Sequence, residues 1–239
     1  MRLYNLTPQV GGLPPGLYPD EAMDGTNALE GFKIFYPENN GREGLFIDIQ
    51  RVFLMVLMPF YGNNPEPWML RVVSSLFGIL TVLGVYFLAK EMFSKKVALL
   101  SSFLIATSSW HINFSRISFR AIMAPFFIVW ALYFLLLSLR QIKESKKSIF
   151  YILNSIFSGI FLGLGFHSYI AFRAMPLLII IVWIFYWLKN KDKAFRKKII
   201  ISAVFSTISA LIVFAPLGIY FLKNPQDFFG RTGQLSIIN

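Results

Sequence analysis

Six apolar stretches that contain no Asp, Glu, Lys or Arg constrain the fold of this chain more than any other feature of its sequence. They are residues 72–89, 97–115, 121–139, 148–172, 174–188 and 199–222. A helix needs about 20 apolar residues to cross the hydrocarbon core of a bilayer. The chain also has a mean hydropathy of +0.59 and only 15% charged residues, which is unusual for a soluble domain. The sequence therefore predicts an all-α polytopic transmembrane helix bundle with about six spans.

The basic residues gather between these stretches. Of the 23 Lys and Arg, 13 lie in residues 90–96, 140–147 and 189–198, and the formal net charge is +11. Short cytoplasmic loops of membrane proteins retain Lys and Arg, so this distribution reports the orientation of the helices. It does not indicate a nucleic-acid partner, which would need a basic surface outside the bilayer. We expect a multi-pass protein of the cell membrane, with these three loops in the cytoplasm.

Helix alternation then places residues 110–120, 167–173 and those after 223 on the external face. The position of the N-terminal part depends on residues 45–62. Their charge-free portion is interrupted by Pro59 and preceded by Asp48 and Arg51, which favours an interfacial helix over a span. We therefore expect three parts: an external segment with interfacial helices at 1–67, the helix bundle at 68–222 and an external segment at 223–239.

Three groups of charged or polar residues converge on the predicted external face. They come from an N-terminal segment rich in acids and from the turns "WHINFSRISFRA" and "GFHSYIAFRA". Each residue alone has a structural alternative, because arginines at helix ends reach lipid headgroups and an aspartate after a proline can cap a helix. Together they indicate a site for a substrate with a charged group. The candidates are Asp20, Glu21, Arg42, Glu43, His111, Arg116, Arg120, His167 and Arg173.

The chemistry of such a site can be narrowed by the motifs that the sequence lacks. It has no Walker lysine loop, GxGxxG, HExxH or GxSxG motif, and no cysteine to serve as nucleophile or thiolate ligand. The chemical groups that remain available for catalysis are a carboxylate and the arginines that face it. This pairing suits a transfer in which the carboxylate takes a proton from an attacking hydroxyl while the cations hold a phosphate leaving group. In a membrane protein we expect that phosphate to belong to a lipid.

The stretches "GLPPGLYPDEAMDGTNALEG" and "NNGREGLFIDIQ", with the pattern that follows them as far as "FRAIMAP", resemble the N-terminal half of the C-type membrane glycosyltransferases. The similar branch contains dolichyl-phosphate-mannose protein mannosyltransferases and bacterial aminoarabinose transferases. The resemblance implies that Asp20 is the catalytic base, that Glu21 is its acidic neighbour and that a juxtamembrane helix begins near Leu45. It also implies inverting transfer of a sugar from a polyprenyl-phosphate donor to a lipid, glycan or protein acceptor on the external face.

Two departures from this family limit what the resemblance implies. Many relatives carry a second acid after the third span, where this chain has Arg116 and Arg120. A two-carboxylate metal site is therefore not expected, and a bound divalent cation is left open. The remaining candidates, Arg42, Glu43, His167 and Arg173 among them, are assigned to substrate binding. Family members are also usually much longer, so the chain is expected to be a piece of a longer protein.

Two other functions are open on the sequence alone. A transporter or lipid-carrier flippase would line a path with charges near mid-membrane, commonly within inverted repeats. Here the candidate charges cluster at one interface and no internal repeat is found, which favours the enzyme. A scaffold subunit that keeps the fold without the activity would carry the same sequence pattern.

Overall fold

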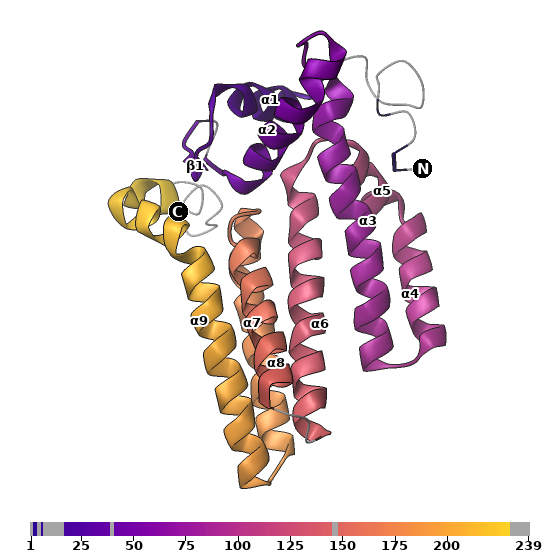
Figure 1. The fold of residues 1–239 in the computed structure, drawn as a ribbon, viewed down its shortest axis with the longest axis vertical. Helices are drawn as coiled ribbons and strands as arrows, with labels where there is room; N and C mark the ends of the chain where they lie inside the picture. The colour runs from indigo at the N-terminus through magenta and orange to yellow at the C-terminus, as the bar shows by residue number, and fades with distance from the viewer. Residues whose placement is uncertain (1, 4–5, 7–16, 39–40, 145–147, 230–239) are drawn as a thin grey trace, which may run out of the picture.

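The computed structural model describes residues 2–3, 6, 17–38, 41–144 and 148–229, whose fold is shown in Figure 1. An N-terminal unit comprises α1 (Pro19–Glu30), the antiparallel pair β1 (Phe35–Tyr36) and β2 (Arg42–Glu43), α2 (Leu45–Leu57) and the 3₁₀ helix η1 (Met58–Tyr61). The rest of the described chain forms α3 (Pro67–Met92), α4 (Lys95–Thr107), α5 (Ser109–Arg116), η2 (Arg120–Ile122), α6 (Met123–Lys143), α7 (Ser148–Gly165), η3 (Ile170–Ala174), α8 (Met175–Lys189) and α9 (Lys193–Lys223).

The long helices run side by side, and the N-terminal unit lies across one end of them (Figure 1). The α3–α4 connection, the end of α6 and the α8–α9 connection all lie at the opposite end. These connections belong to the three stretches that hold 13 of the 23 Lys and Arg, so the structure separates the basic loops from the acidic segment, as the charge pattern predicted. We call the two ends the acidic-motif face and the basic face.

The prediction of an all-α polytopic membrane bundle is confirmed. Among the described residues, four helical segments are long and apolar enough to cross a bilayer: Pro67–Met92, Arg120–Lys143, Ile170–Lys189 and Lys193–Lys223. The stretch predicted as one span at 97–115 is two helices, α4 and α5, which meet at 57° and count together as a fifth. The helix at Ile149–Gly165 is apolar but shorter than these.

The fourth predicted span was wrong at its C-terminal end. It was expected to reach residue 172, but α7 ends at Gly165 and the chain turns back before η3 begins at Ile170. A Cβ atom at Gly165 would lie only 2.0 Å from the ring of Phe172, so the glycine permits the close return of the chain. The turn buries Phe172 completely, and Nη2 of Arg173 lies 3.9 Å from Oε1 of Glu43 in the N-terminal unit.

The helix α2 agrees with the expectation of a non-spanning interfacial helix. It has 13 residues and, within the described part of the chain, is not among the helices that could cross a bilayer. Phe46 is buried in the core of the helix bundle, and Ile47 and Leu54 are buried in a cluster with residues of the N-terminal unit and the start of α3. Met55 and Val56 are more than half exposed. Of the external segment predicted at 223–239, residues 230–239 lie outside the described residues.

Two kinds of packing hold the bundle and the N-terminal unit together. In the bundle, Ser138 of α6, Ser155 of α7 and Ser202 of α9 meet through hydroxyl contacts of 2.7–3.2 Å, because small polar residues allow close approach of helices in a membrane. At the acidic-motif face, Phe35 of β1 is buried with Leu217 and Phe221 of α9. The β1–β2 pair is thereby fixed to the last turns of α9.

Candidate active site

The acidic segment forms the first turns of α1. Pro19 occupies the first helical turn, where its missing N–H costs nothing, and Asp20 and Glu21 follow it near the positive end of the helix dipole. The residue before the helix is Tyr18, so the structural alternative in which Asp20 caps α1 is wrong. The side chain of Asp20 is 55% exposed, while those of Glu21 and Asp24 are 2% exposed.

Glu21 is held in a buried ion pair with Arg71 of α3. Arg71 donates from Nε to Oε1 at 2.9 Å and from Nη2 to Oε2 at 2.8 Å. The backbone N–H groups of Ser118 and Tyr18 donate to the same carboxylate at 2.7 and 2.9 Å. Four donors therefore hold Glu21, and its carboxylate ties α1 to α3 and to the α5–η2 connection.

Arg42 of β2 lies between the two other acids of α1. It donates from Nη2 to Oδ1 of Asp20 at 2.7 Å, and its Nη1 binds Asp24. Burial raises the pKa of the Asp24 carboxyl, while Arg42 and Arg120 act in the opposite direction. One guanidinium thus serves two carboxylates, of which only Asp20 faces solvent.

Glu43, the next residue of β2, lies between two arginines. Nη1 of Arg120 is 3.4 Å from Oε2 of Glu43, and Nη2 of Arg173 is 3.9 Å from Oε1. Both distances exceed the 2.7–2.9 Å typical of a direct charge-assisted hydrogen bond. The Arg120 guanidinium also lies over the ring of Tyr169 at 5.6 Å, and that of Arg173 over Phe228 at 4.3 Å.

His167 lies close to this group, in the turn between α7 and η3. Its Nε2 is 3.0 Å from the backbone carbonyl oxygen of Val213 in α9. Burial lowers the pKa of His167, although the carbonyl and the charge of Glu43 oppose the shift. His167 is therefore a neutral ring beside Glu43 at physiological pH.

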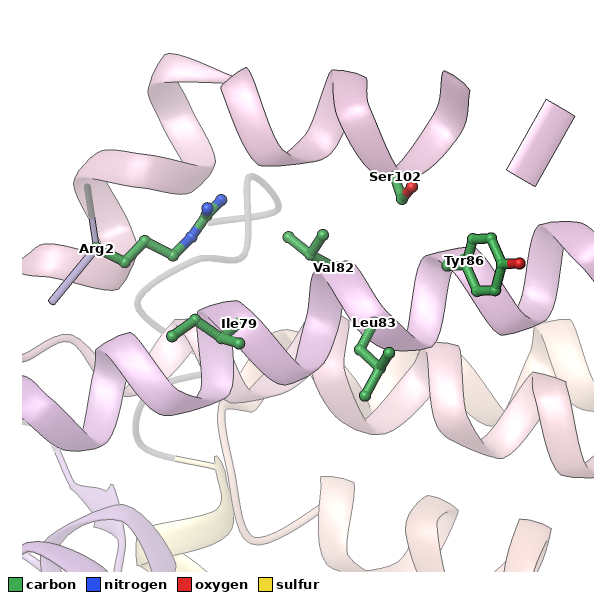
Figure 2. A pocket seen from close by; sticks show the side chains of 6 residues that line it. All are labelled: Arg2, Ile79, Val82, Leu83, Tyr86 and Ser102. Atoms are coloured by element: carbon green, nitrogen blue, oxygen red, sulfur yellow. The ribbon is translucent and has the colours of Figure 1, made fainter. Parts of the chain in front are cut away.

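The structure separates the other predicted histidine from this group. Nδ1 of His111 is 2.9 Å from Nη2 of Arg2, which also donates to the carbonyl oxygen of Ile105 at 3.2 Å. Arg2 lines a cavity of about 330 Å³ between α3 and α4 (Figure 2). Arg116, the last residue of α5, is half-buried and precedes Ser118, the residue whose N–H group binds Glu21.

Arg71 was not among the site residues predicted from the sequence. It lies directly before the apolar stretch 72–89 and was treated as a boundary residue. The sequence did contain an indication of its role. Arg71 lies on the predicted external side, where the positive-inside distribution does not explain an arginine, so a specific acidic partner could have been expected. Asp24 was not among the candidates either, although a spacing of four residues places it on the same side of α1 as Asp20.

The arrangement has the parts needed for a transfer with an anionic leaving group. An exposed carboxylate, Asp20, is oriented by an arginine, and Arg120 and Arg173 stand around a single acid nearby. Within the described residues, no three His, Asp or Glu side chains gather as a metal site. Asp20 and Asp24 do not offer an open pair of ligands either, because Arg42 occupies the position between them.

A comparison with protein-family models identifies the family of the chain. Residues 50–220 match the family described as dolichyl-phosphate-mannose-protein mannosyltransferase. The match includes Arg71, Arg116, Arg120, His167 and Arg173 and begins after the acidic segment. No curated protein matches the chain. No solved structure matches it either. The family match covers most of the chain, which therefore belongs to the dolichyl-phosphate-mannose-protein mannosyltransferase family of membrane glycosyltransferases.

Proposed function

We propose that this glycosyltransferase moves a sugar from a polyprenyl-phosphate donor to an acceptor hydroxyl or amine, with Asp20 as the catalytic base. The observation that carries the proposal is the difference among the acids of α1. Glu21 and Asp24 are buried in ion pairs, whereas Asp20 is 55% exposed and held by one arginine. In the described part of the chain, only Oδ1 of Asp20 receives a hydrogen bond, so Oδ2 is available to an incoming hydroxyl.

The charges of the site are divided in a way that suits this reaction. Around Arg42, two carboxylates share one cation, so this half has an excess of negative charge. Around Glu43, two cations share one carboxylate, so this half has an excess of positive charge. The acceptor binds at the first half, where its proton is attracted, and the donor phosphate binds at the second.

In the proposed step, Asp20 takes the proton of the acceptor as its oxygen or nitrogen attacks the anomeric carbon. The bond between that carbon and the phosphate oxygen breaks, and its electron pair leaves with the phosphate. Arg120 and Arg173 stabilise the resulting charge, since guanidinium groups bind phosphate with two parallel hydrogen bonds. A single displacement inverts the anomeric carbon. Arg42 orients Asp20, Arg116 extends the basic surface, and His167 supplies a neutral polar group near Glu43.

The test is transfer of mannose from a polyprenyl-phosphate donor by the Asp20→Asn variant of the complete protein. Asparagine keeps the shape and can still contact Arg42, but it cannot take the acceptor proton. We expect transfer to fall by roughly 100-fold or more, the scale of losing a general base, with donor affinity little changed. Glu30→Gln, which alters an exposed acid of the same helix, is the matched control and should transfer normally. Undiminished transfer by Asp20→Asn would exclude Asp20 as the catalytic base, whereas absence of transfer by the unmodified protein would favour the non-enzymatic alternatives.

The external position of the site is tested by the accessibility of single cysteines. The chain has no natural cysteine, and both Thr26 of α1 and Lys96 at the start of α4 are exposed. We expect Thr26→Cys to react with an impermeant maleimide in sealed cells and Lys96→Cys to react only after permeabilisation. The reverse pattern would place the acidic-motif face in the cytoplasm.

A further inference from the structure

A large cavity runs along α8 from Leu178 to Lys189, and its charged end lies at the basic face. It has a volume of about 630 Å³ and lies between α3, α6 and α8. Its walls are mainly aliphatic and include Leu88 of α3, Leu132 and Leu136 of α6, and Leu178 and Ile181 of α8. A cavity with such walls inside a membrane protein is suited to a hydrocarbon chain, because a soluble polar molecule gains nothing from these surfaces.

The same cavity carries cations at the ends of its helices. Arg140 and Lys143 belong to the last turn of α6, and Lys189 ends α8. Arg140 is paired with Glu91 of α3 at 2.6 Å. Within the described residues, Lys143 and Lys189 form no ion pair. The cavity therefore combines an apolar wall with an excess of positive charge on one side.

We propose that this cavity binds one anionic phospholipid, with an acyl chain along the α6 and α8 wall and the headgroup phosphate at Lys143 and Lys189. The two parts of the cavity match the two parts of such a lipid. A zwitterionic lipid would fill the apolar wall equally well, but its phosphate charge is balanced within its own headgroup. The lysines therefore select for net negative charge. The proposal does not depend on the transfer reaction, since the lysines that would bind the headgroup lie at the basic face.

The experiment measures lipid binding to the purified, detergent-solubilised protein by native mass spectrometry. The two probes are dioleoyl phosphatidylglycerol and dioleoyl phosphatidylcholine, which have identical chains and differ in headgroup charge. We expect the first phosphatidylglycerol molecule to bind roughly tenfold or more tightly than phosphatidylcholine, as two lysines near one phosphate would produce. Equal affinity of the two lipids would overturn the proposal.

Two sets of variants locate the binding. The double variant Lys143→Gln/Lys189→Gln should lose most of the preference for phosphatidylglycerol. The control Lys95→Gln/Lys96→Gln removes the same charge from the same face, at residues that do not line the cavity, and should retain the preference. An equal loss in the control would show that the basic face attracts anionic lipid without a site, which contradicts the proposal.

A third variant tests the apolar wall while every cation stays in place. Leu178→Trp fills part of the cavity from a membrane-facing position that is 41% exposed, so the fold should tolerate it. We expect phosphatidylglycerol to bind several-fold more weakly to this variant, because the acyl chain loses its place on the wall. Unchanged binding, or displacement of the lipid by millimolar inorganic phosphate, would show that the anion alone is recognised and would refute a lipid site.

Discussion

Two arginine–glutamate arrangements lie within the acidic-motif face and differ in almost every respect. Arg71 and Glu21 form a bidentate ion pair, and their side chains are 0% and 2% exposed. Glu43 is shared by Arg120 and Arg173 at 3.4 and 3.9 Å. The first arrangement uses both oxygens of its carboxylate fully, while the second has more positive charge than its acid can neutralise.

The difference shows how a membrane protein can use one ion-pair chemistry for two purposes. A buried pair with matched geometry and extra backbone donors fixes three chain segments, because loss of either partner would leave a buried charge. A carboxylate that two cations share at longer distances leaves net positive charge around it, which attracts a further anion. We therefore propose that Glu21 and Arg71 maintain the architecture and that Arg120 and Arg173 bind the substrate.

The largest effect is expected from breaking the buried pair. Arg71→Met leaves Glu21 buried without its cation, which should lower the free energy of unfolding by about 3–5 kcal/mol. The measurement is thermal or denaturant unfolding of the purified protein. Lys33→Met removes one partner of the exposed Lys33–Glu30 pair and should cost less than about 1 kcal/mol.

A double variant sharpens this result. Glu21→Gln combined with Arg71→Met removes both charges, and we expect it to be more stable than Arg71→Met alone, because no unpaired charge is then buried. If Arg71→Met is as stable as the unmodified protein, the pair does not hold the fold and Glu21 must be reconsidered as part of the catalytic chemistry.

An intermediate effect is expected at the loosely shared arginines. Arg120→Lys and Arg173→Lys keep the charge but lose the planar pair of donors, so donor affinity should fall by roughly tenfold, about the worth of one hydrogen bond to a charged group. Stability should change little. Arg51→Lys is the matched control, since Arg51 binds backbone carbonyls at the end of α1. Normal donor affinity in both site variants would exclude these arginines from phosphate binding.

The smallest effect concerns pH. Burial lowers the pKa of His167 in the folded protein, so the unfolded chain binds the proton more readily. The free energy of unfolding therefore decreases as the pH falls from about 6.5, the ordinary pKa of histidine, toward the lowered pKa of His167 in the folded protein. We expect the loss of thermal stability between pH 7.5 and 5.5 to be smaller in His167→Gln. An identical loss in both proteins would mean that His167 does not change its protonation in this range.

The helical architecture could be predicted because the apolar stretches indicate the spanning helices and the basic loops indicate their orientation. The sequence did not reveal the break between α4 and α5, because Thr107 and Ser108 interrupt an apolar stretch without a charge or a proline. The end of α7 was also missed, since apolar residues continue as far as Phe172. The helix ends at Gly165 because Phe172 packs against this glycine, a tertiary contact that a local sequence pattern does not reveal.

Several members of the candidate site could be predicted from the sequence, but Arg71, Asp24 and the pairing of the charged groups could not. The grouping of Asp20, Arg42, Glu43, Arg120 and Arg173 followed from helix alternation, and the structure links them through neighbouring ion pairs. Adjacent acids such as Asp20 and Glu21 look equivalent in a sequence. Consecutive residues of a helix point about 100° apart, however, so one faces α3 while the other stays at the surface. Only the packing of α1 on α3 separates their roles.

The short helix α4 has a consequence for the membrane itself. Its 13 residues rise about 20 Å, while the 31 residues of α9 rise about 46 Å, and the hydrocarbon core of a bilayer is about 30 Å thick. Because α5 is bent by 57° from α4, it does not extend α4 along the same axis, and we expect hydrophobic mismatch of opposite sign beside α4 and beside α9. Thinning of the bilayer beside α4 would draw headgroups on that side toward the midplane. A lipid-linked phosphate that approaches past α4 would then begin closer to the midplane than in an undisturbed bilayer.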